Sequence, residues 1–246
     1  MKTRTRRIVL LPAAIMVLGI LFGASLQDAS TILTRMDDVM YAPKDIKGRY
    51  SITVIDRSGR QEVREATFKQ KGTDRRLVRF TSPASQAGIA FLSLPNDVMY
   101  VYLPAFGRER RIAASAKNQN FAGTDLTYED MESVPFSQKY TPRLLRTEPG
   151  AFILELKPRG RSDYSKIVVR VNREHFYPET MEYYDRGNRQ VKEATYTFKR
   201  VGRYWNTEQI EMRDLRRNTS TRIRTTDVQY DTGLGNDAFT VRRLRG

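Results

Sequence analysis

The hydrophobic pattern of the sequence changes from a helical period to a period of two at residue 49, and the shorter period returns along most of the remaining chain. Tyr50, Ile52 and Val54 alternate with polar neighbours before a glycine-containing turn at 57–60. Such alternation predicts half-buried strands, and short turns predict that successive strands pair in antiparallel fashion. We expect strands at residues 49–56, 62–70, 75–81, 89–94, 98–103, 151–157, 165–172, 180–185, 191–199, 204–214 and 221–230.

These strands restrict the fold class. Because no helix alternates with them, Rossmann and TIM-barrel architectures are excluded. Antiparallel strands in sequential order predict a mainly β protein with a few helices, whose sheet is strongly curved or forms a barrel. One amphipathic helix is expected before the sheet at 28–40, because Ile32 and Met36 share a face and Asp28 or Ser30 can cap it.

The N-terminus has the pattern of a secretory signal. Four basic residues and no acid in residues 1–7 precede the uncharged segment 8–26, which ends in small residues. This order is typical of a signal peptide that is cleaved on export. Residues 1–26 are therefore expected to direct the chain across the inner membrane, with an uncleaved anchor as the alternative. Residues 27–246 are expected to form a single domain.

Composition excludes several kinds of active site. The chain has no cysteine, and its one histidine, His175, lies in an expected turn. Disulfides, thiolate nucleophiles, histidine-based triads and Cys/His zinc sites are therefore excluded. The sequence also contains no nucleotide-binding or G-x-S-x-G motif. We expect no catalytic residue, no metal and no cofactor, and hence a protein that is not an enzyme.

The chain is strongly basic. Its formal net charge is +15, and only four of the positive side chains belong to the expected signal. Arginines are spread over almost every segment without a helix-turn-helix, zinc-finger or RNA-binding motif, so nucleic acid is not an expected partner. The charge either forms an ordinary solvated surface or attracts the protein to anionic membrane surfaces and acidic partners.

Residues 104–146 interrupt the strand pattern and are expected to form an insertion that serves as a lid or binding loop. A short capped helix is expected within it at 124–133. The acidic residues of this segment fit helix capping better than a metal site or a glycosidase carboxylate pair. They are Asp125, Glu129, Asp130 and Glu132.

Two interpretations remain open for the arginines at the start of the insertion. They could pair with the acids of the 124–133 segment and latch the insertion onto the sheet. They could instead hold a phosphate or carboxylate headgroup, for which the guanidinium fork is suited. The candidate headgroup or latch residues are Arg108, Arg110, Arg111, Asp125, Glu129 and Asp130.

The segments 89–94 and 98–103 are hydrophobic on both faces. Strands of this kind need a cover on each side of the sheet. The N-terminal helix is expected to cover one side. The insertion or a bound hydrophobic ligand is expected to cover the other.

Two motifs in the middle of the chain carry a family resemblance. They are YLPAFGRERRI at 102–112 and FAGTDLTYEDM at 121–131, with FTSP at 80–83 and GIAFL at 88–92 as further support. Together with the leading helix and first strand, they resemble the outer-membrane lipoprotein-sorting family, the LolA-like carriers of the Gram-negative envelope. The likeness covers most of residues 27–246.

The resemblance implies a half-open antiparallel β-barrel, covered by an N-terminal helix and a helical lid, whose apolar interior holds acyl chains. It implies a periplasmic carrier or chaperone that moves lipoproteins or lipids between the inner and outer membranes. An inner-membrane transporter of the resistance-nodulation-division or ABC type is the implied partner.

Three hypotheses for function remain. The first is the acyl carrier, whose pocket residues are expected to be Phe80, Phe91, Tyr100, Tyr102, Phe106 and Phe121. The second is a non-catalytic envelope interaction or sensor module of the same fold, which binds a membrane transporter or regulator. The third, a hydrolase of envelope polymers, is the weakest, because the residues that such chemistry needs are missing.

Overall fold

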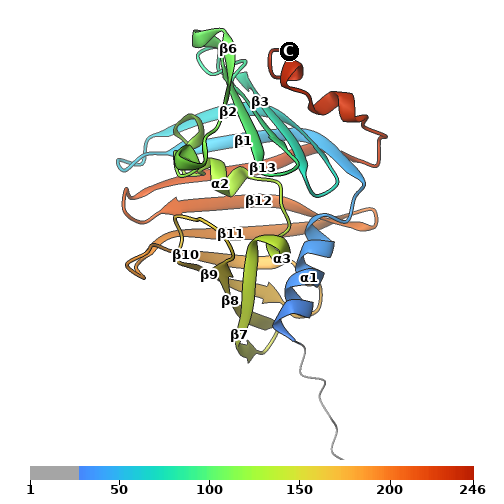
Figure 1. Ribbon diagram of the computed structural model, residues 1–246, viewed down its shortest axis with the longest axis vertical. Coiled ribbons are helices and arrows are strands. Elements are labelled where there is room, and N and C mark those ends of the chain that lie inside the picture. Colours follow the sequence, from blue (N-terminus) through green and yellow to red (C-terminus); the bar gives the residue numbers. More distant parts are fainter. Residues whose placement is uncertain (1–27) are drawn as a thin grey trace, which may run out of the picture.

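The computed structural model describes residues 28–246, so the expected signal at 1–26 lies outside the described residues. The described chain forms one antiparallel sheet of 13 strands, and its edge strands β6 and β7 do not pair with each other (Figure 1). The mainly β, half-open architecture expected from the sequence is therefore confirmed. The strand order is β6-β5-β4-β3-β2-β1-β13-β12-β11-β10-β9-β8-β7. The bounds are β1 (Asp45–Ile55), β2 (Gln61–Lys71), β3 (Arg75–Ser82), β4 (Ala90–Leu94), β5 (Val98–Leu103), β6 (Arg108–Arg111), β7 (Tyr140–Glu148), β8 (Ala151–Pro158), β9 (Lys166–Asn172), β10 (Pro178–Tyr184), β11 (Gln190–Val201), β12 (Tyr204–Asp214) and β13 (Thr219–Tyr230).

All of the expected strands are present, and the expected insertion at 104–146 contains one further strand, β6, and most of another, β7. Neither has a clear period of two. β6 has the sequence RERR, and a register shift between Leu144 and Arg146 interrupts the alternation in β7. The segment that lies on the sheet without belonging to it is therefore residues 112–139. We keep the word insertion for this segment.

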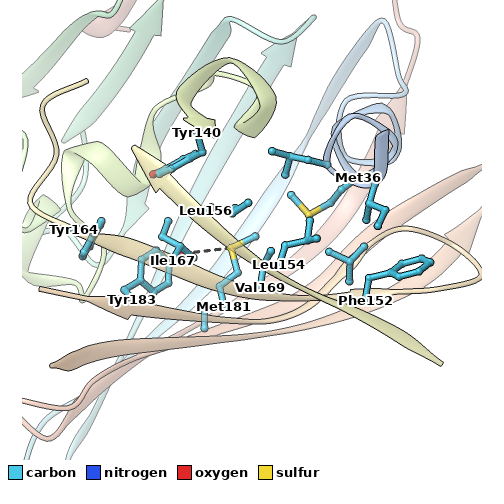
Figure 2. Close-up of a cluster of buried hydrophobic side chains, with 14 of the residues drawn as sticks. Met36, Tyr140, Phe152, Leu154, Leu156, Tyr164, Ile167, Val169, Met181 and Tyr183 are labelled. Carbon is cyan, nitrogen blue, oxygen red and sulfur yellow. Dashed lines mark hydrogen bonds between the residues drawn. The ribbon is translucent and has the colours of Figure 1, made fainter. Parts of the chain in front are cut away.

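Helix α1 (Ala29–Met40) packs on the half of the sheet formed by β7 to β12. We call the face of the sheet that α1 and the insertion cover the inner face. Ile32, Leu33 and Met36 are fully buried there (Figure 2). Burial stabilises the fold by about 1.5–3 kcal/mol for each such side chain. Their sheet neighbours include Leu154, Leu156, Ile167, Val169 and Met181.

The helix also positions the end of the insertion. The Asp37 carboxylate accepts hydrogen bonds from the backbone N–H groups of Phe136 and Ser137 at 2.9 and 2.8 Å. These two residues begin α3 (Phe136–Lys139), so Asp37 supplies the acceptor that the free N–H groups of a helix start require. Described helices of the protein are all too short or too polar to span a membrane.

The half of the inner face formed by β1 to β5 packs against the insertion. Phe80 and Phe91 of the sheet contact Phe121, and Met131 closes the same cluster. Met131 ends α2 (Tyr128–Met131), a helix shorter than the segment 124–133 expected for it. The expected cap is present, because the side chain of Thr127 accepts from the backbone of Asp130 and the Asp130 carboxylate accepts from the backbone of Thr127.

The outer face of β3 to β5 is covered by the C-terminal segment 232–246, which sequence analysis did not single out. Phe239 and Leu244 bury Leu77, Ala90 and Leu92, and the segment lies beside these strands in Figure 1. The expected second cover of β4 and β5 was the N-terminal helix, but α1 occupies the other half of the sheet. A cover built from short turns has no regular hydrophobic period, so no pattern in the sequence indicated it.

Asp45 anchors this C-terminal cover. Its carboxylate accepts hydrogen bonds from the backbone N–H groups of Thr232, Gly233 and Leu234 at 2.8, 2.9 and 3.1 Å, and from the Thr232 hydroxyl at 2.9 Å. Burial raises the pKa of Asp45, but these hydrogen bonds outweigh it and hold the pKa below its usual value. The ionised carboxylate therefore stabilises the attachment of the C-terminus.

Replacing Asp45 by Ala should release residues 232–246 from the outer face, because three backbone N–H groups lose their acceptor. Hydrogen exchange measured by mass spectrometry should show faster exchange across the segment. The same release should occur in the wild type in acid. The folded pKa of Asp45 is lowered, so its carboxylate contributes stability above the unfolded pKa of about 3.9. This stability is lost as the pH falls through the folded pKa. Asp237→Ala, an exposed change within the segment, is the control. Unchanged exchange in the Asp45 variant would contradict this account.

Candidate ligand cavity

A cavity of about 240 Å³ lies between the insertion and the inner face, where the two halves of the sheet meet. Strands β1 to β3 supply one wall, strands β9 to β13 the other, and the insertion the roof. Apolar side chains form most of its lining. They are Met40, Pro43, Ile46, Ile52, Phe68, Val78, Phe80, Phe121, Leu126, Met131, Val134, Phe136, Ile167, Trp205, Ile210, Met212 and Ile223.

Stacked aromatic rings make the first wall rigid. The ring of Phe121 lies 5.5 Å from that of Phe80 and nearly parallel to it. The rings of Tyr50 and Phe68 stack at 4.1 Å on the neighbouring strands. Aromatic pairs add about 0.5–1.5 kcal/mol beyond the area they bury. Because one of these rings belongs to the insertion, the stacking also joins the roof to the wall.

Three tyrosines from β7, β10 and β11 also line the cavity. Burial raises the pKa of Tyr140, of Tyr183 and, to about 12, of Tyr196, so all three stay neutral at physiological pH. Figure 2 shows Tyr183 beside Met181, joined to its sulfur by a hydrogen bond. The Tyr183 and Tyr196 hydroxyls each donate to the Met181 sulfur at 3.6 Å, and all three phenols are too weakly acidic for proton transfer near neutral pH.

The insertion is bound to the sheet through Asp125. Its carboxylate pairs with Arg217 at 2.7 Å and accepts hydrogen bonds from the hydroxyls of Thr219 and Thr221 of β13. The Asp125 side chain is only 2% exposed. Charge-assisted hydrogen bonds of this kind are about twice as strong as neutral ones. One end of the roof is therefore fixed to the centre of the sheet.

A second attachment is the buried pair of Asp130 and Lys192. The two charged groups are 2.9 Å apart, and their side chains are 4% and 2% exposed. The Tyr164 hydroxyl also donates to Asp130 at 3.0 Å. Glu129 beside it accepts from the Ser162 hydroxyl at 2.6 Å. These acids therefore attach the roof to β11 and to the loop before β9.

Arg108, Arg110 and Arg111 do not take part in this latch. They lie exposed on β6 at the edge of the sheet, and within residues 28–246 no ion pair joins them to the acids of the insertion. Asp125 and Asp130 are instead paired with basic side chains from the β12–β13 turn and from β11, and Glu129 accepts from Ser162. The described residues also contain no group of three or more His, Cys, Asp or Glu side chains placed to hold a metal ion.

The aromatic residues expected to form an acyl pocket are divided between three places. Phe80 and Phe121 line the cavity, and Phe91 packs directly behind them. Tyr100 and Tyr102 lie on the outer face under the C-terminal segment. Phe106 is 62% exposed at the β5–β6 turn.

Sequence analysis missed several cavity residues with polar groups. Arg76 and Gln70 line the cavity, as does Tyr41 just after α1. Arg76 is in phase with Val78 and Phe80 on β3, and residues two apart on a strand share a face. Because Phe80 was an expected pocket residue, this spacing could have predicted that Arg76 lies on the cavity side of the strand.

Replacing Lys192 by Met should lower the free energy of unfolding by about 3–5 kcal/mol, because Asp130 is left as an uncompensated buried charge. Urea denaturation followed by circular dichroism measures the change. Lys199→Met is the matched control on the same strand, since the pair of Lys199 with Glu208 is about half exposed and worth at most about 1 kcal/mol.

The double variant Lys192→Met/Asp130→Asn should recover most of the lost stability. It leaves no buried charge, and an asparagine can still accept from the backbone of Thr127. A single Lys192 variant as stable as the wild type would contradict an energetic role for the pair.

Comparison with known proteins places this fold. A family model described as "-like: Uncharacterized protein" matches residues 72–246, and a search of curated proteins finds no match. A putative outer membrane lipoprotein-sorting protein domain from Vibrio parahaemolyticus has 27% identity and a TM-score of 0.80, over 87% of this chain and 98% of that one.

Two more solved structures are similar. A DUF1329 family protein from Desulfovibrio piger has 26% identity and a TM-score of 0.82, over 88% of this chain and 97% of that one. A LolA superfamily protein from Nitrosomonas europaea has 24% identity and a TM-score of 0.74, over 87% and 97%. The resemblance seen in the sequence is confirmed. The chain belongs to this family of uncharacterized, LolA-like proteins, which share the fold of outer-membrane lipoprotein-sorting proteins.

Proposed function

We propose that the protein is a periplasmic carrier that binds an acyl chain of a lipoprotein or lipid in the cavity and moves it between the inner and outer membranes. The observation that carries this proposal is an apolar cavity roofed by the insertion in a LolA-like fold. Each CH₂ group that leaves water contributes about 0.8 kcal/mol, so even part of a chain provides useful affinity.

The size of the cavity limits what it holds in this conformation. A cavity of about 150 Å³ accommodates a benzene molecule. The 240 Å³ cavity here therefore suits a segment of one acyl chain. A cargo with several chains requires the insertion to move away from the inner face. The insertion is the part that can move, because it is held by side-chain contacts and not by strand pairing.

Loading such a cargo from a bilayer needs energy from outside the protein. The sequence contains no nucleotide-binding motif. We therefore place the energy source in a membrane partner, for which an inner-membrane transporter is the candidate.

The half-buried side chain of Thr225 lines the cavity. Replacing Thr225 by Trp should therefore fill the cavity and reduce the affinity for a fluorescent acyl probe by at least about 10-fold. Thr226→Trp is the matched control, since this neighbour is exposed. Overpacking costs about 1–3 kcal/mol of stability, which circular dichroism monitors separately. If Thr225→Trp and Thr226→Trp bound the probe equally well, the cavity would not be the acyl-binding site.

Native mass spectrometry of the protein purified from a periplasm without detergent tests the function itself. A bound acyl species is the expected result, and lipid extraction then identifies its class. An empty protein that also takes up no acyl probe would refute the carrier and favour the interaction module of the same fold.

We also propose that the β5–β6 turn is the part of the carrier that meets an anionic membrane surface. Phe106 projects from it with 62% of its surface exposed. Arg108, Arg110 and Arg111 follow on β6 and are exposed as well. The pair of Glu109 with Arg245, at 2.7 Å, brings the basic C-terminus to the same place (Figure 1). An exposed aromatic ring among arginines suits the headgroup layer of an anionic bilayer.

The triple variant Arg108→Gln/Arg110→Gln/Arg111→Gln should bind phosphatidylglycerol vesicles about 100-fold more weakly, since each arginine near an anionic surface contributes about 1 kcal/mol. Vesicle co-sedimentation at low salt measures the effect. Arg57→Gln/Arg60→Gln/Arg216→Gln removes the same charge from the β1–β2 and β12–β13 turns and is the control. An equal loss in both variants would show a diffuse charge effect and contradict a localised docking site.

A further inference from the structure

Arg76 places a positive charge inside the cavity. It lines the cavity from β3, on the same face as Val78 and Phe80. Its Nε and Nη2 atoms donate to the Gln70 side-chain oxygen at 3.1 and 2.8 Å, and its Nη1 atom approaches the Met131 carbonyl oxygen at 3.4 Å. Gln70 and Met131 therefore hold the guanidinium in place without neutralising its charge.

The other charged groups that line the cavity already have partners. Asp130 pairs with Lys192. Glu132 pairs with Lys139 at 2.6 Å and with Lys117 at 3.3 Å. The Glu129 carboxylate accepts from the Ser162 hydroxyl and from the backbone N–H of Asp163, at 2.6 and 3.5 Å. Within residues 28–246, Arg76 differs from these groups because it forms no ion pair with a carboxylate.

The charge of Arg76 acts on three partly buried tyrosines. Burial raises the pKa of Tyr41 and of Tyr196 to about 12 and raises that of Tyr50, and the positive charge of Arg76 opposes the rise in each case. These residues come from the end of α1, from β11 and from β1. All three tyrosines line the cavity. Arg76 therefore lies where both halves of the sheet meet the C-terminal end of α1.

The hydrogen bonds of Arg76 leave donors for a ligand. A guanidinium has five N–H groups. Gln70 accepts from two and Met131 from a third, which leaves one N–H on each terminal nitrogen. Two parallel donors are the arrangement that receives the paired oxygens of a carboxylate or phosphate. An uncompensated charge beside apolar side chains is also unfavourable, and a bound anion removes that cost.

We propose that Arg76 is the headgroup site of the cavity and that the ligand is a single-chain amphiphile with an anionic carboxylate or phosphate end. The anionic end binds the two remaining donors of Arg76, and the chain lies along the apolar lining. This inference rests on the proposed function as an acyl carrier. It specifies the chemical class of the ligand and the residue that selects it.

The test compares cis-parinaric acid, a fluorescent fatty acid, with its methyl ester on the folded protein at about pH 8. The two probes share a chain and differ in charge. The wild type should bind the acid about 10- to 100-fold more tightly, because hydrogen bonds to charged groups contribute that much to binding. Arg76→Gln should abolish the preference while the ester binds as before.

Arg75→Gln is the matched control, since it makes the same change one residue earlier on β3, where the side chain pairs with Asp74 at 2.8 Å. Its preference for the acid should equal that of the wild type. Arg76→Lys should retain part of the preference, because it keeps the charge and loses the fork. Competition by lysophosphatidic acid or by a fatty acid then identifies the preferred anionic end.

The outcomes separate the two proposals. Equal binding of acid and ester by the wild type overturns the role of Arg76 and leaves the acyl carrier intact, and this result needs no variant. Binding of neither probe refutes the carrier itself. Loss of the acid preference in both Arg75→Gln and Arg76→Gln would show a general charge effect and overturn the headgroup site.

Discussion

The pairing of β1 with β13 is the constraint on which the rest of the structure depends. It joins the first strand of the chain to the last along most of their length, so two meanders become a single sheet. The free edges are then β6 and β7, which are consecutive in the sequence. The segment between them has to pass from one edge of the sheet to the other. A lid over the inner face is thus a consequence of strand order, and the cavity lies where this segment bridges the two halves.

The attachments of the insertion differ on the two halves of the sheet. Toward β1 to β5 it presents Phe121 to an aromatic wall, and the Arg64 side chain of β2 donates to the Ala122 carbonyl oxygen. Toward β11 to β13 it presents the buried Asp125 to the partly exposed Arg217, and the buried Asp130 to the buried Lys192. Buried ion pairs add little net stability, because desolvation opposes their attraction, but they allow few alternative arrangements. The ion pairs therefore fix the position of the insertion over β11 to β13.

The sequence predicted eleven of the thirteen strands, the leading helix and the insertion, because each has a hydrophobic period or interrupts one. It could not predict which face of a two-sided strand looks inward. In β5 both phases are apolar, and the structure places Met99 and Val101 on the inner face with Tyr100 and Tyr102 on the outer one. The C-terminal cover that makes the outer face apolar has no period of its own. Arg76 was missed for the related reason that a basic residue on a strand usually faces solvent.

The proposed carrier must bind its cargo and also release it, and the geometry of the cavity bears on both. A volume of 240 Å³ buries only part of a long chain, so the apolar contribution stays moderate and the remainder of the chain stays in contact with the insertion or solvent. A fixed guanidinium adds selectivity for the charged end without enlarging the apolar contact. The affinity for the proposed ligand then has two contributions, one from the apolar chain and one from the charged end. Moving the insertion would lower the first, and a competing anion at an acceptor membrane would lower the second. Arg76 donates to the insertion through Met131, so opening of the roof and loosening of the headgroup site are mechanically linked.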